Sequence, residues 1–268
     1  MEAEGVKPIE PVAQRLSSGD LIRFRCDGDG KGRQNGWAIL YLDERPAGAF
    51  GNYRLGVSLK WKAGEDVSLS PAERQAMRRE WAAAKQRRQE ERERSEAEAA
   101  RDAAEMWASA ARASQDHGYL YRKGILPAPF RQLGAKLLVP MYDSEGTMQN
   151  IQRIDGDGTK RFLRGGRTAG LFFMFGSPSR RGETVCMGEG LANLSAIHSA
   201  TGYPAIATFS AKNLLAVARI WHALRPDLQY IVCGDDDTHL ERNVGREAAE
   251  AAAREIGARL TFATAATA

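Results

Sequence analysis

Three carboxylates in the last third of the chain have the type and position needed to bind a divalent metal ion. Glu189 stands between two glycines after the apolar segment 185–187, and Asp235 and Asp237 follow a second apolar segment, 230–233. If both segments are strands of a parallel sheet, they end at the edge where ligands bind in such folds. Side chains alternate along an extended segment, so Asp235 and Asp237 project to one side. Oxygen donors without nitrogen or sulfur favour Mg²⁺ or Mn²⁺.

The same acidic residues have a second interpretation as helix N-caps. Glu189 and Asp237 each lie near the start of a predicted helix, where a carboxylate stabilises the free N–H groups. Against this, the three consecutive aspartates 235–237 repel one another, and a bound cation is the simplest remedy. We therefore predict a divalent-metal site and keep capping as the alternative.

A basic stretch with two glycines precedes the acidic turns, over residues 160–167. Glycine lets backbone N–H groups approach an anion, and arginine binds phosphate in a fork. The stretch predicts a nucleotide or template site whose cations are Lys160, Arg161, Arg164 and Arg167. A solvent-exposed turn is the alternative.

Further polar residues fall near the same predicted rim. Lys212 and Asn213 follow the apolar segment 203–209, which places the Lys212 ammonium beside the acids. There it could hold a triphosphate or neutralise the acidic cluster, and the sequence favours neither role. His239 lies two residues beyond Asp237 and is a candidate phosphate contact.

These motifs resemble the TOPRIM domain of bacterial-type primases and topoisomerases. The resemblance is carried by Glu189 in its Gly-Glu-Gly turn and by Asp235-x-Asp237 at the end of a later strand. The wider pattern resembles the plasmid and phage primases and primase-helicases, over residues 117–262 and more loosely 19–62. It consists of Gly188-Glu189-Gly190-Leu191, Thr201-Gly202, Phe209-Ser210-Ala211-Lys212-Asn213-Leu214, Gly234-Asp235-Asp236-Asp237 and Asn243-x-Gly245-Arg246.

The resemblance implies a DNA primase, a nucleotidyltransferase that makes short RNA primers on single-stranded DNA from NTPs with Mg²⁺ or Mn²⁺. It would serve DNA replication of a plasmid, phage or integrated element. Glu189, Asp235 and Asp237 would be the catalytic and metal-binding residues. The sequence shows neither a zinc ribbon nor a GxxxxGK[ST] helicase motif, so we expect no zinc and expect a separate helicase or replication initiator as partner.

Two other functions fit the same motifs. One is a TOPRIM nuclease or strand-cutting enzyme, and the other is a non-catalytic DNA-binding accessory protein with the same fold. A topoisomerase needs a tyrosine nucleophile in a separate domain, for which the remaining chain looks too small. Product analysis separates the three functions, since they give short products, cut template, or neither.

The elements that must position these residues combine α+β and α/β organisation. Alternating strands and helices in the last third predict a central parallel sheet. The segments are a loose lead-in over 1–18, a small antiparallel β module over 19–66, a long charged helix over 70–113, the N-terminal part of a primase-like core over 114–182, and a TOPRIM domain over 183–268. Within the primase-like core, segments 136–143, 148–154 and 171–175 predict a β-meander, the last of them its final strand.

The long helix is predicted to be an exposed spacer. Ser70-Pro71-Ala72-Glu73 is a helix start, and no glycine or proline follows before Gly118. Residues 83–104 lack an apolar face and an apolar heptad seam, which disfavours a coiled coil, and their mixed charges disfavour a nucleic-acid helix. Its ends should pack on the neighbouring parts through Met77, Trp81, Met106 and Trp107.

The β module carries cations and aromatic residues of the kind that bind single strands. They are Arg23, Arg25, Arg33, Arg54 and Lys60 with Trp37, Tyr53 and Trp61. An ordinary solvated sheet face with core aromatics is the alternative. The glycine-rich stretch 28–32 is a hairpin turn rather than a phosphate loop, because it lacks the GK[ST] ending.

Composition sets broad limits on the function. The chain has 268 residues with 38 Lys plus Arg against 34 Asp plus Glu, which is mildly basic and only weakly indicates a polyanionic partner. Three distant cysteines support neither disulfides nor a zinc site. We expect no membrane association and a cytoplasmic location, because no signal peptide or apolar run of ~20 residues is present.

Overall fold

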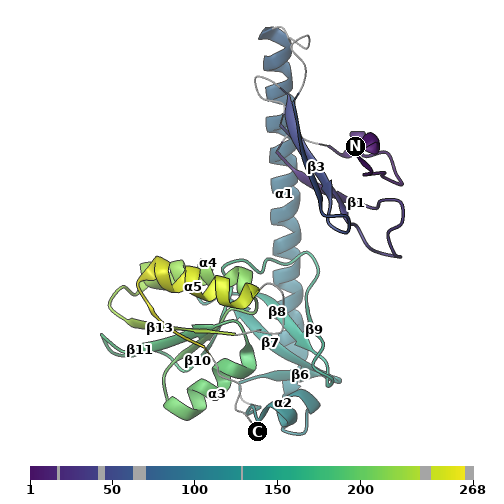
Figure 1. The fold of residues 1–268 in the computed structure, drawn as a ribbon. Helices are drawn as coiled ribbons and strands as arrows, with labels where there is room; N and C mark the ends of the chain where they lie inside the picture. Colours follow the sequence, from purple (N-terminus) through teal and green to yellow (C-terminus); the bar gives the residue numbers. More distant parts are fainter. Residues whose placement is uncertain (17–18, 42–45, 63–70, 128, 236–242, 263–268) are drawn as a thin grey trace. The chain divides into compact units, whose positions relative to one another are not determined.

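The computed structural model describes residues 1–16, 19–41, 46–62, 71–127, 129–235 and 243–262 (Figure 1). The chain divides into two compact units that meet between Glu91 and Arg92. This boundary falls inside helix α1 (Pro71–Ser109), the long helix predicted from the sequence. Each unit is described by itself.

The first unit contains an antiparallel sheet with the strand order β1-β2-β3-β4. The strands are β1 (Leu21–Phe24), β2 (Gly36–Tyr41), β3 (Ala47–Asn52) and β4 (Val57–Lys62). The hairpin between β1 and β2 is held by the buried Asp29 carboxylate, which accepts hydrogen bonds from the backbone N–H groups of Cys26 (2.9 Å) and Asn35 (3.1 Å).

The N-terminal lead-in is more ordered than expected. It forms two short 3-10 helices, η1 (Glu2–Glu4) and η2 (Ala13–Arg15), and pairs with the sheet through a bridge between Pro8 and Cys26. Val6 and Val12 are buried in the small core of this unit. Isolated valines carry no periodic signal, but they cover one face of a sheet that would otherwise be open to water.

The sequence predicted that helix α1 is exposed over residues 83–104. The structure shows that part of this stretch is buried. Ala99 is 3% exposed and Ala103 is fully buried, and Ala103 packs with Leu138 and Ile151 in the second unit. Alanine has a small side chain that lets a helix backbone lie close to a sheet, so this contact does not require the large apolar face whose absence predicted exposure. Met106 and Trp107 pack there as predicted, whereas the side chains of Met77 and Trp81 lie outside the described residues.

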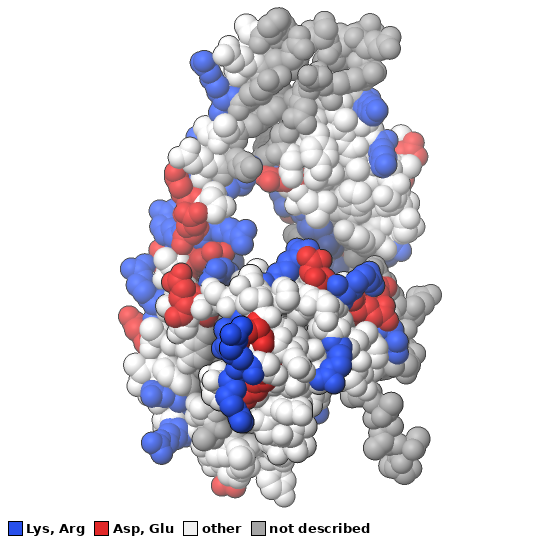
Figure 2. Space-filling view, turned by 90° about the vertical axis from the view of Figure 1, so that its left-hand side faces the viewer, with Lys and Arg blue, Asp and Glu red and all other residues white. Residues whose placement is uncertain are grey.

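Charges of both signs are distributed over the surface. On the face shown in Figure 2, Lys and Arg lie interspersed with Asp and Glu, which agrees with a formal net charge of only +4. On α1, Arg92 and Glu96 form an i,i+4 ion pair of 2.8 Å. Such exposed pairs add little to the stability of a helix, because water and salt screen the charges.

The second unit begins with an antiparallel sheet of order β5-β6-β7-β8-β9. Its elements are β5 (Ala111–Arg112), α2 (Gly118–Lys123), β6 (Arg131–Leu133), β7 (Lys136–Tyr142), β8 (Met148–Ile154) and β9 (Lys160–Phe162). Strands β7 and β8 match the predicted segments, and β9 carries the start of the basic stretch.

The other sheet of this unit has the order β10-β12-β11-β13-β14, in which four strands are parallel and β10 is antiparallel at one edge. Its elements are β10 (Phe173–Phe175), β11 (Thr184–Gly188), α3 (Leu191–Thr201), β12 (Ala205–Ala207), α4 (Ala211–Leu224), β13 (Gln229–Gly234), α5 (Val244–Ile256) and β14 (Arg259–Phe262). The mixed α/β architecture is therefore confirmed.

One predicted strand belongs to a different sheet. Segment 171–175 was expected to end the meander, but β10 pairs with β12 of the parallel sheet, and a single bridge between Tyr142 and Phe172 connects it to β7. Alternating burial along an apolar segment identifies a strand without identifying its partner. Here the partner follows from Phe173 and Phe175, which are buried in the core between the two sheets.

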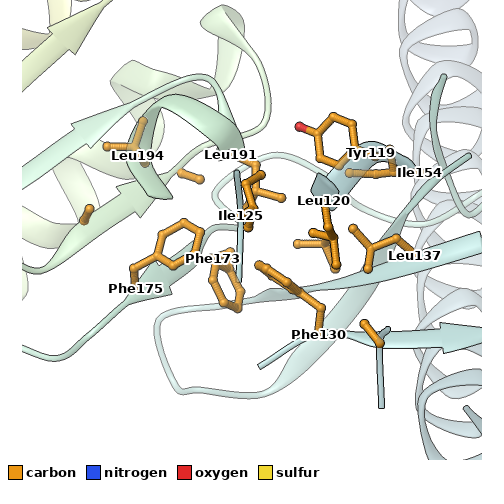
Figure 3. Close-up of a cluster of buried hydrophobic side chains, with 14 of the residues drawn as sticks. Tyr119, Leu120, Ile125, Phe130, Leu137, Ile154, Phe173, Phe175, Leu191 and Leu194 are labelled. Atoms are coloured by element: carbon orange, nitrogen blue, oxygen red, sulfur yellow. The ribbon is translucent and has the colours of Figure 1, made fainter. Parts of the chain in front are cut away.

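That core fixes the two sheets of the second unit against each other (Figure 3). Leu120 and Ile125 meet Phe130 and Phe173 there, and Leu191 of α3 closes the cluster. Helices α4 and α5 pack on the opposite face of the parallel sheet, over a second core that includes Met187 and Val232. Among the described residues, no helix has the length and apolar character needed to cross a membrane.

Candidate active site

The acidic turns lie side by side at the carboxyl edge of the parallel sheet. Strands β11 and β13 are neighbours, with Gly188 paired to Cys233, so Glu189 and Asp235 leave the sheet at adjacent points. Both carboxylates are half-buried and line one cavity of about 560 Å³. The convergence predicted from the sequence is therefore present for these two residues, while Asp237 and His239 lie outside the described residues.

Close approach of the two strands depends on glycine. A Cβ atom at Gly188 would lie 2.5 Å from the carbonyl oxygen of Cys233 and 3.0 Å from a methyl carbon of Leu194. A side chain at Gly188 would push the two acidic turns apart, since real Cβ atoms do not approach backbone atoms this closely. At Gly234 a Cβ atom would lie 2.6 Å from the Phe262 ring and 2.8 Å from the Cβ atom of Ala249, so this glycine lets β14 and α5 pack closely against the end of β13.

The N-caps of the helices that follow the two turns are not acidic residues. The N-cap of α3 is Gly190, which has no side chain, rather than Glu189. The N-cap of α5 is Asn243, whose side chain accepts a hydrogen bond of 3.0 Å from the N–H group of Arg246. The first turn of α5 therefore has its cap without Asp237, which weakens the alternative interpretation of the acidic residues.

A third turn, between β12 and α4, is tied to Glu189. The N–H group of Thr208 donates to Gly188 O (2.9 Å), and the N–H group of Phe209 donates to Glu189 O (3.0 Å). Among the described residues other than glycine, Phe209 alone has a positive φ, 67°. Its ring lines the cavity and packs edge-on against Phe162 of β9, with centroids 6.4 Å apart. A strained conformation of this kind is often retained at functional sites.

The sequence analysis missed Asn193, which lines the same cavity from α3. Its amide nitrogen donates a hydrogen bond of 2.7 Å to Asp235 Oδ1. Its position four residues after Glu189 was the available signal, because the first turn of a helix that follows an acidic turn faces the same edge of the sheet.

Lys160 is the basic-stretch residue that the structure places in the cavity. Its ammonium lies 5.7 Å from the centroid of the Tyr119 ring. Although the residue as a whole is exposed, partial burial of the ammonium lowers the pKa of Lys160, and the charges of Glu189 and Asp235 oppose this shift. The site therefore combines two carboxylates with a cation that they influence directly.

The cavity also contains two cations that were not predicted. Arg122 and Lys123, at the end of α2, line it together with Asp157 and Gly158 of the β8–β9 turn. One guanidinium nitrogen of Arg122 donates to Gly156 O at 2.5 Å, which holds α2 against that turn. Both residues lie within the range 117–262 that resembles the primase family, but no role was assigned to them from the sequence.

The remaining predicted cations lie elsewhere in the described structure. Arg161 and Arg164 are exposed, Arg167 lies 3.7 Å from the Asp143 carboxylate, and Lys212 is exposed at the start of α4. These residues do not line the cavity, since the described lining contains only Lys160 of the predicted basic set.

Asn213 differs from its predicted role as a nucleotide contact. Its side chain is 6% exposed, its oxygen accepts a hydrogen bond from the N–H group of Gly170 (2.7 Å), and its nitrogen donates to Leu171 O (2.8 Å) and Thr208 O (2.9 Å). All three bonds go to the backbone. Asn213 therefore holds the turn before α4 in place.

The described residues supply a partial ligand set for a divalent cation. Glu189 and Asp235 contribute oxygen donors, and the described lining includes no histidine or cysteine. No group of three metal-binding side chains is present in the described ranges, which exclude Asp236 and Asp237. The donor chemistry fits a hard cation such as Mg²⁺ or Mn²⁺ rather than zinc.

The chain is similar in sequence to proteins called DNA primase, which confirms the resemblance to primases seen in the sequence. Two of these relatives are Escherichia coli proteins, each called DNA primase TraC. One is 34% identical over 256 residues, covering 92% of this chain and 24% of the relative, and the other is 32% identical over 256 residues, covering 92% and 18%. The chain thus spans about a quarter of the first relative and less than a fifth of the second. No family model matches the sequence.

Two solved structures show a weak likeness. The primase fragment of the bacteriophage T7 primase-helicase protein has 16% identity and a TM-score of 0.42, covering 55% of this chain and 64% of that one. A DnaG primase catalytic domain bound to ssDNA has 13% identity and a TM-score of 0.34, covering 59% and 54%.

Proposed function

We propose that this chain is the catalytic segment of a DNA primase that makes short RNA primers on single-stranded DNA, with NTPs and Mg²⁺ or Mn²⁺, for a plasmid, phage or integrated element. The observation that carries the proposal is the meeting of Glu189, Asp235 and Lys160 in one cavity. Homology to proteins called DNA primase supports it. We assign residues 183–268 to a TOPRIM domain and 114–182 to the N-terminal part of the catalytic core.

The carboxylates would bind the metal and move a proton. Glu189 and Asp235, together with Asp237, would hold the cation. When bound, Mg²⁺ or Mn²⁺ would neutralise the triphosphate and stabilise the charge that develops on the attacking and leaving oxygens. Glu189 lies on a different turn from the aspartates and would accept the proton of the attacking hydroxyl. Asn193 would orient Asp235 through its 2.7 Å hydrogen bond.

The cations would bind the incoming nucleotide. Lys160, Arg122 and Lys123 line the cavity together with the carboxylates, and a triphosphate in the cavity would be held by both. The cavity volume of about 560 Å³ lies in the range of small-molecule sites.

The cations outside the cavity would contact the template. They are the exposed Arg161, Arg164 and Lys212 together with the half-buried Arg167, and His239 would add a phosphate contact. A separate helicase or replication initiator would supply the strand. Changing two of these arginines to alanine should weaken single-strand binding and reduce its salt slope by roughly 0.7 for each lost phosphate contact.

The test is incubation of the chain with single-stranded DNA, labelled NTPs and Mn²⁺, followed by product analysis. Short RNA products that disappear in Glu189→Gln and persist in Glu145→Gln would support the proposal. Glu145 is a suitable control because it is an exposed acid in a turn of the same unit, outside the described cavity lining. Cleaved template would indicate the nuclease alternative, and template binding without either product would indicate an accessory protein.

A further inference from the structure

We propose that the four-stranded sheet of the first unit binds single-stranded nucleic acid on the face opposite its small core. This site is separate from the cavity of the second unit. It does not depend on whether that cavity makes primers, because it rests only on residues of β1 to β4 and the turn after β3.

The strand register defines the two faces of the sheet. Phe24 and Ala38 point to the core side, where they are 1% and 3% exposed. Because side chains alternate, Arg23, Trp37 and Lys60 project from the other side. Three rows of neighbouring residues cross this outer face from strand to strand. They are Arg23–Trp37–Gly51, Ile39–Ala49–Lys60 and Tyr41–Ala47–Lys62.

The charges on this outer face have one sign. The four strands contain no aspartate or glutamate, and their charged residues are Arg23, Lys60 and Lys62. All three are exposed and lie on the outer face. An anionic occupant is therefore favoured, although the chain as a whole is only mildly basic.

Two acids beside the sheet form ion pairs within the described residues. Asp20, just before β1, lies 2.7 Å from the guanidinium of Arg88. Asp29 accepts backbone hydrogen bonds from the first hairpin and lies 3.4 Å from Arg54. These two carboxylates are therefore already engaged by cations outside the four strands.

Aromatic residues at one end of the face supply surfaces on which bases can stack. Tyr53 is 58% exposed, the Arg23 guanidinium lies 4.5 Å from its ring centroid, and the Trp37 ring lies 6.1 Å away. Successive bases of a single strand stack on aromatic side chains of this kind, and arginine adds to the stack. Paired bases of a duplex are not available for such contacts, so the occupant is single-stranded.

Small residues separate the aromatic residues from the lysines. Ala47, Ala49 and Gly51 occupy the outer face of β3, between Trp37 and Tyr41 on β2 and the lysines on β4. A Cβ atom at Gly51 would lie 2.7 Å from Trp37 Nε1, so the indole reaches over β3 at that point. A strand laid along β3 would place its phosphates toward Lys60 and Lys62 and its bases toward Trp37 and Tyr53.

The test measures binding of the full chain to labelled oligo(dT) and oligo(U) of about 15 nucleotides, a length that one such surface can cover. Fluorescence anisotropy is followed over a salt series. Lys60→Gln with Lys62→Gln should lower the slope of log K against log salt by about 1.4, because each lost phosphate contact removes about 0.7. Tyr53→Ala should weaken binding roughly ten-fold, while Tyr53→Phe should restore it.

Matched controls separate this face from general charge and aromatic effects. Arg79→Gln with Arg87→Gln removes two exposed cations from α1, and Tyr203→Ala removes an exposed tyrosine from the second unit. Both controls should bind like the wild type. Binding is measured without NTPs and separately from primer synthesis, so a failure of primer synthesis would leave this inference standing.

Three results would overturn the proposal. An unchanged salt slope in the double lysine variant would show that these cations do not contact phosphate. Unchanged affinity in Tyr53→Ala, with a melting temperature like that of the wild type, would exclude stacking. Equal competition by heparin and by unlabelled oligo(dT) would indicate a general anion surface. Binding of oligo(dT) but not oligo(U), or the reverse, would support the site and identify its ligand.

Discussion

Asn193 Nδ2 lies 2.7 Å from Asp235 Oδ1 and joins the first turn of α3 to the end of β13. A neutral donor at this position fixes one carboxylate oxygen without cancelling its charge, so the other oxygen keeps its capacity to bind a cation. Helix α3 follows Glu189 directly, and the hydrogen bond therefore couples the two acidic turns.

The first prediction concerns this bond. Asn193→Ala should lower primer synthesis about ten-fold and raise the metal concentration needed for half-maximal rate, because Asp235 loses its fixed orientation. The free energy of unfolding should change by only about 1 kcal/mol, the usual effect of one hydrogen bond. Metal titrations of activity and urea denaturation measure the two effects. Ser199→Ala, at an exposed position of the same helix, should change neither.

The second prediction concerns the metal. Mg²⁺ or Mn²⁺ should raise the melting temperature, because a ligand that binds only the folded state stabilises it by about 2.7 kcal/mol at a hundred times its Kd. Asp235→Asn with Asp237→Asn should remove this shift and leave the metal-free protein at least as stable, since like charges are deleted. Glu189→Gln should abolish synthesis but keep most of the shift. A double aspartate variant that melts below the wild type without metal would contradict the metal-site assignment.

The third prediction follows from the lowered pKa of Lys160. Between that pKa and the ordinary lysine value of 10.5, the folded protein has released the proton while the unfolded chain keeps it. The folding cost of the buried ammonium is therefore present at neutral pH and disappears as the pH rises through this window. Nucleotide binding should weaken over the same window. In the Lys160→Arg variant the affinity for nucleotide should not change with pH over this window, because arginine remains protonated. If the affinity of both proteins falls in parallel as the pH rises, Lys160 is not the titrating group.

The fourth prediction concerns Phe209 and its φ of 67°. Glycine adopts this conformation without strain, whereas residues with a Cβ atom are strained there by about 1 kcal/mol or more. Both Phe209→Gly and Phe209→Ala lose the packing on Phe162, but the glycine variant should be the more stable by about 1 kcal/mol. This order is the reverse of that expected at an ordinary position. Urea denaturation of the two variants side by side gives the answer.

The fifth prediction concerns acid stability of the first unit. Hydrogen bonds from the backbone of Cys26 and the side chain of Asn35 lower the pKa of Asp29 to about 2, from 3.8. The unfolded chain takes up this proton first as the pH falls, so the stabilisation by Asp29 is complete above pH 3.8 and is lost toward pH 2. Amide hydrogen exchange in β1 and β2 should increase over this range. Asp29→Asn should exchange faster at neutral pH and lose the acid dependence, while Asp27→Asn, an exposed neighbour, should behave like the wild type.

The parallel sheet could be predicted from the sequence because its elements have local signals. The apolar segments before Glu189 and Asp235 form β11 and β13, and helices alternate with the strands as predicted. Parallel strands end at one edge, so the convergence of the two carboxylates follows from chain order. Residues that act through distant contacts gave no comparable signal.

Arg122 and Asn213 illustrate this limit. Arg122 reaches the cavity because α2 packs against the β8–β9 turn, a contact across 34 positions of sequence. Asn213 lies beside Lys212 in the motif, but its amide bonds to Gly170 and Leu171, which bury it beneath the turn. The structural role of Asn213 depends on contacts with residues more than 40 positions away in the sequence. The pattern of residues around Asn213 does not reveal such contacts.

The burial of Ala103 determines where the catalytic unit can be cut. A fragment starting near residue 114, just after the long helix, would remove Ala99 and Ala103 and leave Leu138 and Ile151 open to water. The truncated protein should aggregate on expression, because apolar side chains that are fully buried in the longer chain would form an exposed hydrophobic patch. A fragment starting at Arg92 keeps the end of the helix over the sheet, so the shortest well-behaved polypeptide for crystallisation or assay should begin there, within a helix rather than in a loop.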